Sequence, residues 1–340
     1  MLNTGNLTTI TSVVASTTPN QESHQFEKTP VWYAQAVMFV FLIIAIGFGN
    51  TLVLVATWLD KRLHQPNKYF IACLAVADLL VAFLCIPIRL YVTSHKFIKL
   101  EHCQFWLFFD DCCQEASIIA LTVISIDRHF KISKPLKYRT QMTTFRAFIL
   151  ISFIWLFSSG FSTLRLFAVS TRTEMVAVMQ CIRLERQYST IIASVVFFFV
   201  PTLIITAMYT SIFYIAHKRQ KMIRNGALGE TVAADHQFQR KALLQDLKII
   251  RMLALVVFTF FVCWAPFFIL LLLLNYKEDY IVMSLGMRNL EIVVLVFISI
   301  LPLFNSLCNP IIYAFFDRQY CKAFKRLLRL RVLSMENGSQ

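Results

Sequence analysis

The stretch IVVLVFISILPLFNSLCNPIIYAFF, residues 292–316, contains no Asp, Glu, Lys, Arg or His. A helix needs roughly 20 apolar residues to cross the hydrocarbon core of a bilayer, so this run is long enough to span one. The chain repeats the pattern in Trp32–Trp58, Gln187–Ala216 and Met252–Leu274, which also lack charged residues. We therefore expect a membrane protein rather than a soluble one.

Three further runs bring the expected number of spans to seven. Ala147–Leu164 is shorter but uncharged, and Tyr69–Pro87 is interrupted only by Asp78. Phe105–Ile126 is interrupted by an acidic group of three, Asp110, Asp111 and Glu115. The runs are too long for barrel strands, which need only about 10 residues of alternating polarity. The predicted fold is an all-α bundle of seven transmembrane helices, followed by a short amphipathic cytoplasmic helix.

The overall composition agrees with this fold and predicts its orientation. Hydrophobic residues make up 57% of the chain and charged residues 15%, whereas soluble domains carry about 25% charged residues. Of the 33 Lys and Arg, 23 fall in the first, third and fifth loops between the spans and in the C-terminal tail, which all lie on the same side of the membrane. The positive-inside rule then places the N-terminus outside the plasma membrane and the C-terminus in the cytoplasm. Short basic loops next to a membrane indicate anionic lipid as a partner, and no nucleic acid.

The domain boundaries follow from where the apolar runs begin and end. We expect an extracellular disordered tail at 1–31, the seven-helix domain at 32–315, the amphipathic helix at 316–331 and a cytoplasmic tail at 332–340. Asn6, in Asn-Leu-Thr, is a candidate glycosylation site in the outer tail. Cys103 and Cys181 fall near the oxidising outer face and form the predicted disulfide. Cys321 in the amphipathic helix is a candidate for palmitoylation.

Each predicted span carries one or two polar or helix-breaking residues in a characteristic local sequence. In chain order these are Asn50 in GFGNTLVLVA, Asp78 in LAVADLL, Asp127-Arg128-His129 in SIDRHF, Trp155 in SFIWLF, Pro201 and Tyr209 in FVPTLIITAMY, Trp264 and Pro266 in FVCWAPFF, and Asn309, Pro310 and Tyr313 in NPIIY. This ordered set resembles the rhodopsin-like (class A) G-protein-coupled receptors over about residues 32–328. The resemblance implies a receptor that binds an extracellular ligand, activates a heterotrimeric G protein and meets arrestin and receptor kinases. It implies no enzymatic activity and no resident cofactor.

Matching the motifs residue by residue implies two further sites. Asp78 would bind an allosteric sodium ion with Ser117, Asn305 and Asn309, which supply the oxygen ligands that a hard cation prefers. Arg128 would be an activation switch, held by Asp127 and Asp246 and released when span six swings outward. The same resemblance places Tyr209 and Tyr313 in the switch region and makes Ile118, Pro201 and Phe260 a packing relay.

The register of the third span indicates the class of ligand. Counting from Cys103 to Arg128 places Asp110 where aminergic receptors carry the aspartate that pairs with a protonated amine. Trp264, Phe267 and Phe268 in CWAPFF would supply aromatic faces for the cation. The remaining candidate ligand contacts are Asp111, Gln114, Ser194 and Ser299. Span seven departs from aminergic receptors, with Ile300 and Leu303 in place of the Trp and Tyr that usually close the pocket.

Several alternatives stay open at this stage. Asp111 and Glu115 are spaced i,i+4, so their charges repel unless a cation lies near. Arg165 could neutralise them, or the ligand could bring a second positive charge. Arg89 could pair with Asp110, in which case the ligand would be a peptide, a lipid or another non-amine. A transporter or channel is a less favoured alternative, because the sequence contains no internal repeat of the kind that many transporters have.

Overall fold

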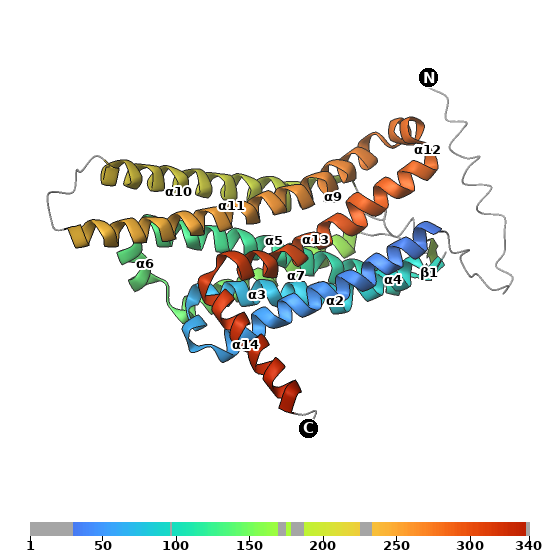
Figure 1. Cartoon of the computed structure of the whole chain (residues 1–340). Coiled ribbons are helices and arrows are strands. Elements are labelled where there is room, and N and C mark those ends of the chain that lie inside the picture. Colours follow the sequence, from blue (N-terminus) through green and yellow to red (C-terminus); the bar gives the residue numbers. More distant parts are fainter. Residues whose placement is uncertain (1–29, 96, 169–174, 178–186, 225–232, 338–340) are drawn as a thin grey trace, which may run out of the picture.

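The computed structural model describes residues 30–95, 97–168, 175–177, 187–224 and 233–337. These residues form an elongated bundle of helices that run along a common direction, with one helix leaving the bundle at an angle near the C-terminus (Figure 1). The first four spans are α2 (Pro30–Leu59); α3 (Pro66–Leu80), η2 (Val81–Cys85) and α4 (Ile86–Thr93); α5 (Leu100–Ser133); and α7 (Thr144–Ala168). The last three are α9 (Gln187–Ser194), η3 (Val195–Phe199) and α10 (Val200–Arg224); α11 (Ala233–Tyr276); and α12 (Glu278–Val294), η4 (Leu295–Ile300) and α13 (Leu301–Phe316). Shorter connecting elements are η1 (Lys61–Leu63) and α6 (Pro135–Gln141), and α14 (Arg318–Asn337) follows the last span.

The helices agree with the seven runs predicted from the sequence. Six of the described spans are long and apolar enough to cross a membrane by composition alone. The remaining one, α5, carries Asp110, Asp111 and Glu115 in its first half. It packs against α3, α7 and α10, so it is surrounded by other helices and its acidic side chains have protein neighbours. The charges that weaken its apolar pattern are therefore consistent with a central span.

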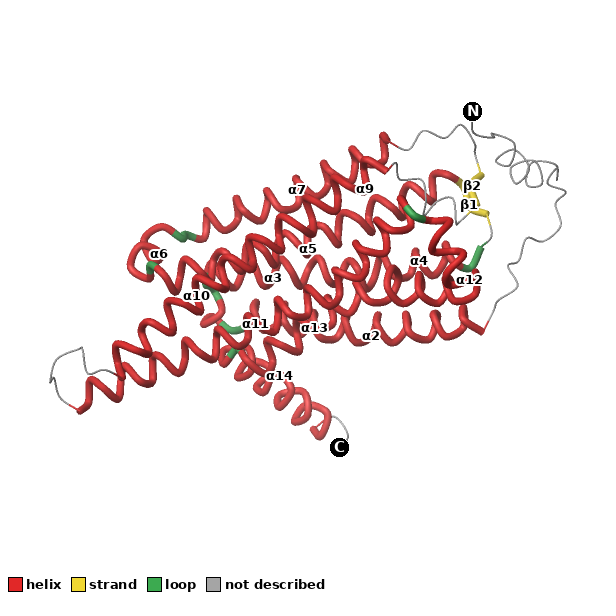
Figure 2. The backbone as a smooth tube through the Cα atoms, turned by 90° about the horizontal axis from the view of Figure 1, so that it is seen from above, coloured by secondary structure: helices red, strands yellow, loops and turns green. Residues whose placement is uncertain are grey.

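A two-stranded sheet marks one end of the bundle. β1 (Phe97–Lys99) pairs in antiparallel register with β2 (Met175–Ala177), so that Ile98 lies opposite Val176. The strands lie beside α4 and α12 in Figure 2, whereas α6 and α14 lie toward the opposite end. We call these the sheet end and the α14 end. The sheet joins the loop before α5 to the loop after α7 and thereby connects two spans at the sheet end.

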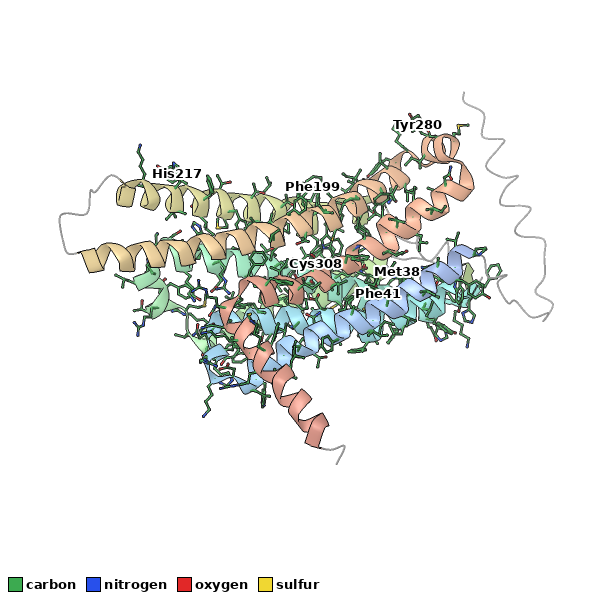
Figure 3. The ribbon with its side chains drawn as sticks, in the orientation of Figure 1. Met38, Phe41, Phe199, His217, Tyr280 and Cys308 are labelled. Atoms are coloured by element: carbon green, nitrogen blue, oxygen red, sulfur yellow. The ribbon has the colours of Figure 1, made fainter. Side chains whose placement is uncertain are left out.

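The outer surface of the bundle is covered by apolar side chains. The side chains of Val37, Leu156 and Leu203 are 71%, 74% and 69% exposed. A water-facing surface would carry mainly polar side chains at such positions. Figure 3 shows side chains such as Phe41 and Phe199 on the surface of the ribbon, and both are about half exposed. An apolar surface of this extent requires contact with lipid, because monomeric soluble proteins rarely expose large contiguous apolar patches.

Small residues and polar contacts hold the helices together within the apolar bundle. A Cβ atom added at Gly49 of α2 would lie 2.9 Å from Pro310 of α13, so glycine is needed for the close approach of these helices. Asn50 donates to the carbonyl oxygens of Ile46 at 3.1 Å and Ser306 at 3.2 Å, which links the same two helices. Such small-residue and amide contacts are typical of helix packing in membranes.

Three spans contain a π-helical turn: η2, η3 and η4. A π-helical turn inserts one extra residue, which rotates the rest of the helix by roughly 100° relative to an uninterrupted α-helix. In the second span this turn directly precedes α4, whose second residue is Pro87. The rotation affects the direction of every α4 side chain, including that of Arg89, which is buried.

The C-terminal helix is fixed to the bundle by a buried polar group that we call the α14 anchor, made of Thr57, Lys68, Asp317 and Tyr320. The Lys68 ammonium forms an ion pair with Asp317 and lies 4.7 Å from the centre of the Tyr320 ring. The Tyr320 hydroxyl and the Thr57 hydroxyl are 2.8 Å apart. Asp317 also accepts from the backbone N–H groups of residues 319 and 320, which caps the first turn of α14. The helix runs to Asn337, past the end at 331 expected from the sequence.

Candidate functional site

Asp110 of α5 lies in a buried ion pair with Arg89 of α4. Its Oδ2 accepts from Arg89 Nη2 at 2.5 Å and from Gln114 Nε2, one turn along α5, at 2.7 Å. Arg89 Nη1 donates to the carbonyl oxygen of Ser299 in η4 at 2.9 Å, and its guanidinium lies 5.9 Å from the Trp106 ring. The structure therefore forms the Arg89–Asp110 pair that the sequence left open as an alternative, with Gln114 and the backbone of Ser299 beside it. The roles of Asp110, Gln114 and Ser299 as ligand contacts stay predictions.

The hydrogen bonds of this ion pair are incomplete. Asp110 Oδ1 and Arg89 Nε are buried and have no hydrogen-bond partner among the described residues. The two residues share one contact between Nη2 and Oδ2 rather than the parallel pair of contacts that Arg and a carboxylate often make. Both residues are more than nine-tenths buried, so the two unused atoms are shielded from solvent.

Arg165 of α7 binds the other two carboxylates of α5. Its Nη1 lies 3.0 Å from Asp111 Oδ2 and 3.5 Å from Glu115 Oε1. Glu115 Oε2 also accepts from the hydroxyl of Ser162 at 3.1 Å. One guanidinium thus lies between two carboxylates at i,i+4 positions, where their repulsion would otherwise be largest. Of the alternatives left open for Asp111 and Glu115, the structure forms the internal salt bridge.

We call Arg89, Asp110, Asp111, Glu115 and Arg165 the α5 charge cluster. With every group ionised, its three carboxylates and two guanidinium groups leave one negative charge uncompensated among these five residues. An uncompensated charge in a low-dielectric interior costs free energy unless it takes up a proton or meets a cation. The cluster can therefore take up one further positive charge, either a proton on one of its carboxyl groups or a cation.

Aromatic rings from α11 and η3 form a second part of the candidate site. Trp264 and Phe267 meet edge to face with ring centres 5.5 Å apart, and Phe268 lies 4.9 Å from Phe267. Phe198 extends the group by stacking on Phe268 at 5.2 Å. Trp264 Nε1 is buried with no hydrogen-bond partner in the described part of the chain. These rings offer the faces expected to receive a cation or an aromatic ligand.

Ser194 sits apart from these contacts in the described geometry. Its hydroxyl donates to the carbonyl oxygen of Thr190 at 2.7 Å, one turn earlier in α9, and the side chain is buried. A hydroxyl that back-bonds to its own helix can rotate to another acceptor without moving the backbone. Its role as a ligand contact stays a prediction.

The residues predicted to hold sodium converge around Asp78 of α3. Asp78 accepts from Asn309 Nδ2 at 3.0 Å and from the Ser117 hydroxyl at 3.4 Å. Asn305 is buried one turn before Asn309 on α13. Because Asn309 uses its nitrogen toward Asp78, its amide oxygen is available for another partner. The donor set of one carboxylate, a hydroxyl and amide oxygens fits a hard monovalent cation.

The predicted switch residues lie toward the α14 end, with contacts different from those expected. Asp127 Oδ1 accepts from the Tyr138 hydroxyl of α6 at 2.7 Å, and the described ion pairs include none between Asp127 and Arg128. With its amide oxygen turned toward Arg128, Asn67 accepts from both terminal nitrogens at 3.2 and 3.3 Å. Burial, followed by the Asp127 charge, raises the pKa of Tyr138, so its hydroxyl stays protonated and donates.

The other switch residues are packed rather than exposed. Tyr209 of α10 meets the Ser125 hydroxyl at 3.4 Å, and Tyr313 of α13 stacks on Tyr320 of the α14 anchor at 5.9 Å. The relay residues Ile118, Pro201 and Phe260 are all buried. The side chain of Asp246 lies outside the described residues, so its predicted contact with Arg128 stays a prediction.

The cysteine and modification sites are only partly visible. Cys103 is disulfide-bonded, and Cys181, its predicted partner, lies outside the described residues. Asn6 lies outside them as well. Cys321 of α14 is a partly buried free thiol. Glycosylation of Asn6, pairing with Cys181 and palmitoylation of Cys321 stay predictions.

Comparison with known proteins decides the family. The model of the 7 transmembrane receptor (rhodopsin family) matches residues 49–313, well over half of the chain. The chain belongs to the rhodopsin family of seven-transmembrane receptors. Similar curated proteins are the 5-hydroxytryptamine receptors 1B of Homo sapiens and Didelphis virginiana, each 29% identical. The matches cover 89% and 92% of this chain and 88% and 91% of those proteins.

Family membership confirms several predictions made from the sequence. The all-helical seven-span fold, the receptor class and the absence of an enzymatic role agree with the family. A rhodopsin-family receptor is a multi-pass membrane protein that binds an extracellular ligand and couples to a G protein. The match to this family favours a receptor over the transporter and channel alternatives.

Several contacts were not predicted from the sequence, and four of them bear on the switch region and the charge cluster. They are the Lys68–Asp317 ion pair, the Tyr138–Asp127 hydrogen bond, the Arg128–Asn67 contact and the placement of Trp106 beside Arg89. Lys68 lies just before the apolar run that begins at Tyr69, and the structure buries it in the first turn of α3, where a charge needs a partner. Nothing in the sequence indicated which of the distant acids would supply it.

Proposed function

We propose that this receptor responds to a small extracellular ligand with an ammonium group, and that Asp110 is the anchor for that group. Three features support the proposal. The α5 charge cluster has one negative charge in excess, the aromatic group of Trp264, Phe267 and Phe268 provides faces for a cation, and the similar proteins are named as receptors for 5-hydroxytryptamine, an amine. The buried Asp110, whose Oδ1 has no hydrogen-bond partner among the described residues, is the observation that carries the proposal.

In this account the ligand competes with Arg89 for Asp110. Ligand binding would favour the receptor state with the α14 end of α11 moved outward, since a ligand shifts an equilibrium by its differential affinity for two states. That state would expose Arg128 to a heterotrimeric G protein and later to receptor kinases and arrestin. The N-terminus would face the outside of the plasma membrane.

The test is a screen of biogenic amines on cells that express the receptor, with a G-protein activation readout. Wild-type receptor should respond to at least one amine, and Asp110→Asn should lower the potency of that amine by about 100-fold, the scale of a buried charge-assisted contact. Thr122→Ala serves as a matched control on α5, because the Thr122 hydroxyl donates to the Ile118 carbonyl oxygen of its own helix. An amine response that is unchanged by Asp110→Asn would contradict the anchor role.

The Arg89–Asp110 ion pair also supports a second candidate function. If that pair stays intact in the active state, Asp110 would hold the pocket together and the ligand would be a peptide, a lipid or another non-amine. Arg89→Ala separates the two. Under the amine proposal it removes a competitor and raises amine potency, whereas under the second candidate it leaves the receptor without any amine response.

A further inference from the structure

The Arg89–Asp110 pair leaves one acceptor and one donor unused at the same buried place. Asp110 Oδ1 accepts nothing and Arg89 Nε donates to nothing among the described residues. The exposed fractions of Asp110 and Arg89 are 7% and 6%, so bulk water does not satisfy these atoms. Buried polar groups in native proteins are normally paired, and exceptions call for a functional explanation.

A ligand that carries only an ammonium group would pair with Asp110 but would not provide a partner for Arg89. An ammonium group that takes Asp110 would leave the Arg89 guanidinium buried with the Ser299 carbonyl oxygen and the Trp106 ring face as its remaining partners. Neither of these carries a negative charge. A buried charge that loses its counter-ion is strongly unfavourable.

The other two carboxylates of the α5 charge cluster are already paired, so neither is available to Arg89. Asp111 lies 3.0 Å from Arg165, and Glu115 shares the same guanidinium at 3.5 Å while accepting from Ser162. Taking either carboxylate for Arg89 would weaken the contacts of Arg165 in turn. The negative charge that compensates Arg89 must therefore come from outside the cluster.

We propose that the ligand is a zwitterion of the α-amino-acid type, whose ammonium group pairs with Asp110 and whose carboxylate pairs with Arg89. This inference rests on the proposed function and names its ligand class more closely. Such a ligand would enter between the two side chains, replace their single contact with two, and give partners to both unused atoms. Because it adds no net charge, the one excess negative charge of the cluster stays where it lies now, between Asp111 and Glu115 around Arg165.

The aromatic group selects among amino acids. Trp264, Phe267 and Phe268 present ring faces and edges that favour a flat aromatic side chain on the ligand. The buried Trp264 Nε1 would donate to an acceptor on that side chain. An aromatic α-amino acid therefore fits better than an aliphatic one.

The experiment compares matched pairs of ligands that differ only in the carboxylate. The probes are tryptophan with tryptamine, tyrosine with tyramine, phenylalanine with phenethylamine and histidine with histamine, applied to cells with a G-protein activation readout. In the best pair the amino acid should be at least about tenfold more potent than the amine, the scale of one added charge-assisted contact. The methyl ester of that amino acid, which keeps the ammonium but lacks the negative charge, should lose the same advantage.

Variants at Arg89 then assign the preference to this side chain. Arg89→Gln should abolish the advantage of the amino acid over its amine, and Arg89→Lys should retain part of it. Arg165→Gln is the matched control, because it removes the other guanidinium of the cluster and should keep the preference. Surface labelling of each variant accompanies the assay, and the wild-type comparison with the methyl ester decides the question if Arg89→Gln does not reach the surface.

The outcomes separate this inference from the proposed function. A wild-type response to amines with equal or weaker responses to the amino acids would overturn the zwitterion and leave the amine anchor standing. A preference for the amino acid that persists in Arg89→Gln would also overturn it. Failure of every amine and every amino acid would contradict the proposed function itself.

Discussion

The α14 anchor and the α5 charge cluster are both buried groups of charge, but only one of them is fully paired. In the α14 anchor, Asp317 accepts from Lys68 and from two backbone N–H groups, and Tyr320 bonds to Thr57. In the α5 charge cluster, Asp110 and Arg89 each have a polar atom with no partner in the part of the chain that the structure describes, and the carboxylates outnumber the guanidinium groups. A fully paired group stabilises one structure, whereas an incompletely paired group can gain contacts from a ligand.

The largest effect on stability is expected at the α14 anchor. Asp317→Ala should destabilise the receptor by about 3–5 kcal/mol, because it leaves the Lys68 ammonium buried without its partner and uncaps α14. Thermal unfolding of purified receptor in detergent measures the loss. The matched control is Asp60→Ala. Asp60 also caps a short helix and pairs with a basic residue, but the side chain of its partner Arg62 is 60% exposed, whereas that of Lys68 is 3% exposed. Equal losses for the two variants would contradict the distinction.

The pH dependence of the anchor has a defined sign. Burial alone would raise the pKa of Asp317, but the Lys68 charge and hydrogen bond outweigh it and the net pKa is lowered. A carboxyl group with a lowered folded-state pKa contributes stability above its unfolded pKa and loses it as the pH falls through the folded value. The wild type should therefore lose thermal stability in acid below about pH 4, and Asp317→Asn should show less of this dependence.

The next largest effect is the coupling between Arg89 and Asp110. A double-mutant cycle with Arg89→Gln and Asp110→Asn should give a coupling energy of about 2 kcal/mol in the ligand-free receptor, because one contact joins the pair instead of two. Thermal unfolding of the four proteins provides the cycle. A coupling near zero would show that the two side chains do not meet and would remove the basis for competition by a ligand.

A smaller effect is expected at Arg165. Arg165→Gln leaves Asp111 and Glu115 with a neutral neighbour, and one of them can take up a proton instead, so the loss should be only about 1 kcal/mol. The measurement is again thermal unfolding, with Arg165→Lys as the charge-retaining control. A loss as large as that of Asp317→Ala would contradict this expectation and show that Arg165 is as important for stability as the α14 anchor.

The smallest effect concerns sodium and Asp78. Replacing sodium with N-methyl-D-glucamine should raise agonist affinity only about threefold in the wild type, below the coupling of about 1–3 kcal/mol that is typical between two sites. Asp78→Asn should remove this dependence, because the carboxylate is the one charged oxygen donor in the group of Asp78, Ser117 and Asn309. Sodium dependence that persists in Asp78→Asn would locate the ion elsewhere.

Much of the fold follows from the sequence because the bilayer imposes a simple rule. Runs such as 292–316 must be helical to satisfy their own backbone, and the polar motifs identify the order of the helices. The acidic group on α5 was recognised in the same way, and so was Arg165 as a partner of Asp111. These predictions depend on local sequence and on the cost of charge in an apolar environment.

The sequence offered the Arg89–Asp110 pair as one alternative but did not display the features that choose it. The π-helical turn η2 changes the direction in which the α4 side chains point, including that of Arg89. The residue types in Val81–Cys85 do not indicate that this turn contains an extra residue. Asp127 was expected to hold Arg128, whereas in the structure it accepts from the Tyr138 hydroxyl of a separate helix. Side-chain partners across helices are set by small rotations, and these arise from the packing of the whole bundle.

The most direct test of the central claim is a cryo-electron microscopy structure of the receptor with an agonist and a G protein. The decisive measurement is the distance from the ligand nitrogen to the Asp110 carboxylate. We predict hydrogen-bond distance, about 2.7–2.9 Å, with Arg89 separated from Asp110 and turned toward the ligand. An intact Arg89–Asp110 contact with the ligand bound elsewhere would contradict the account.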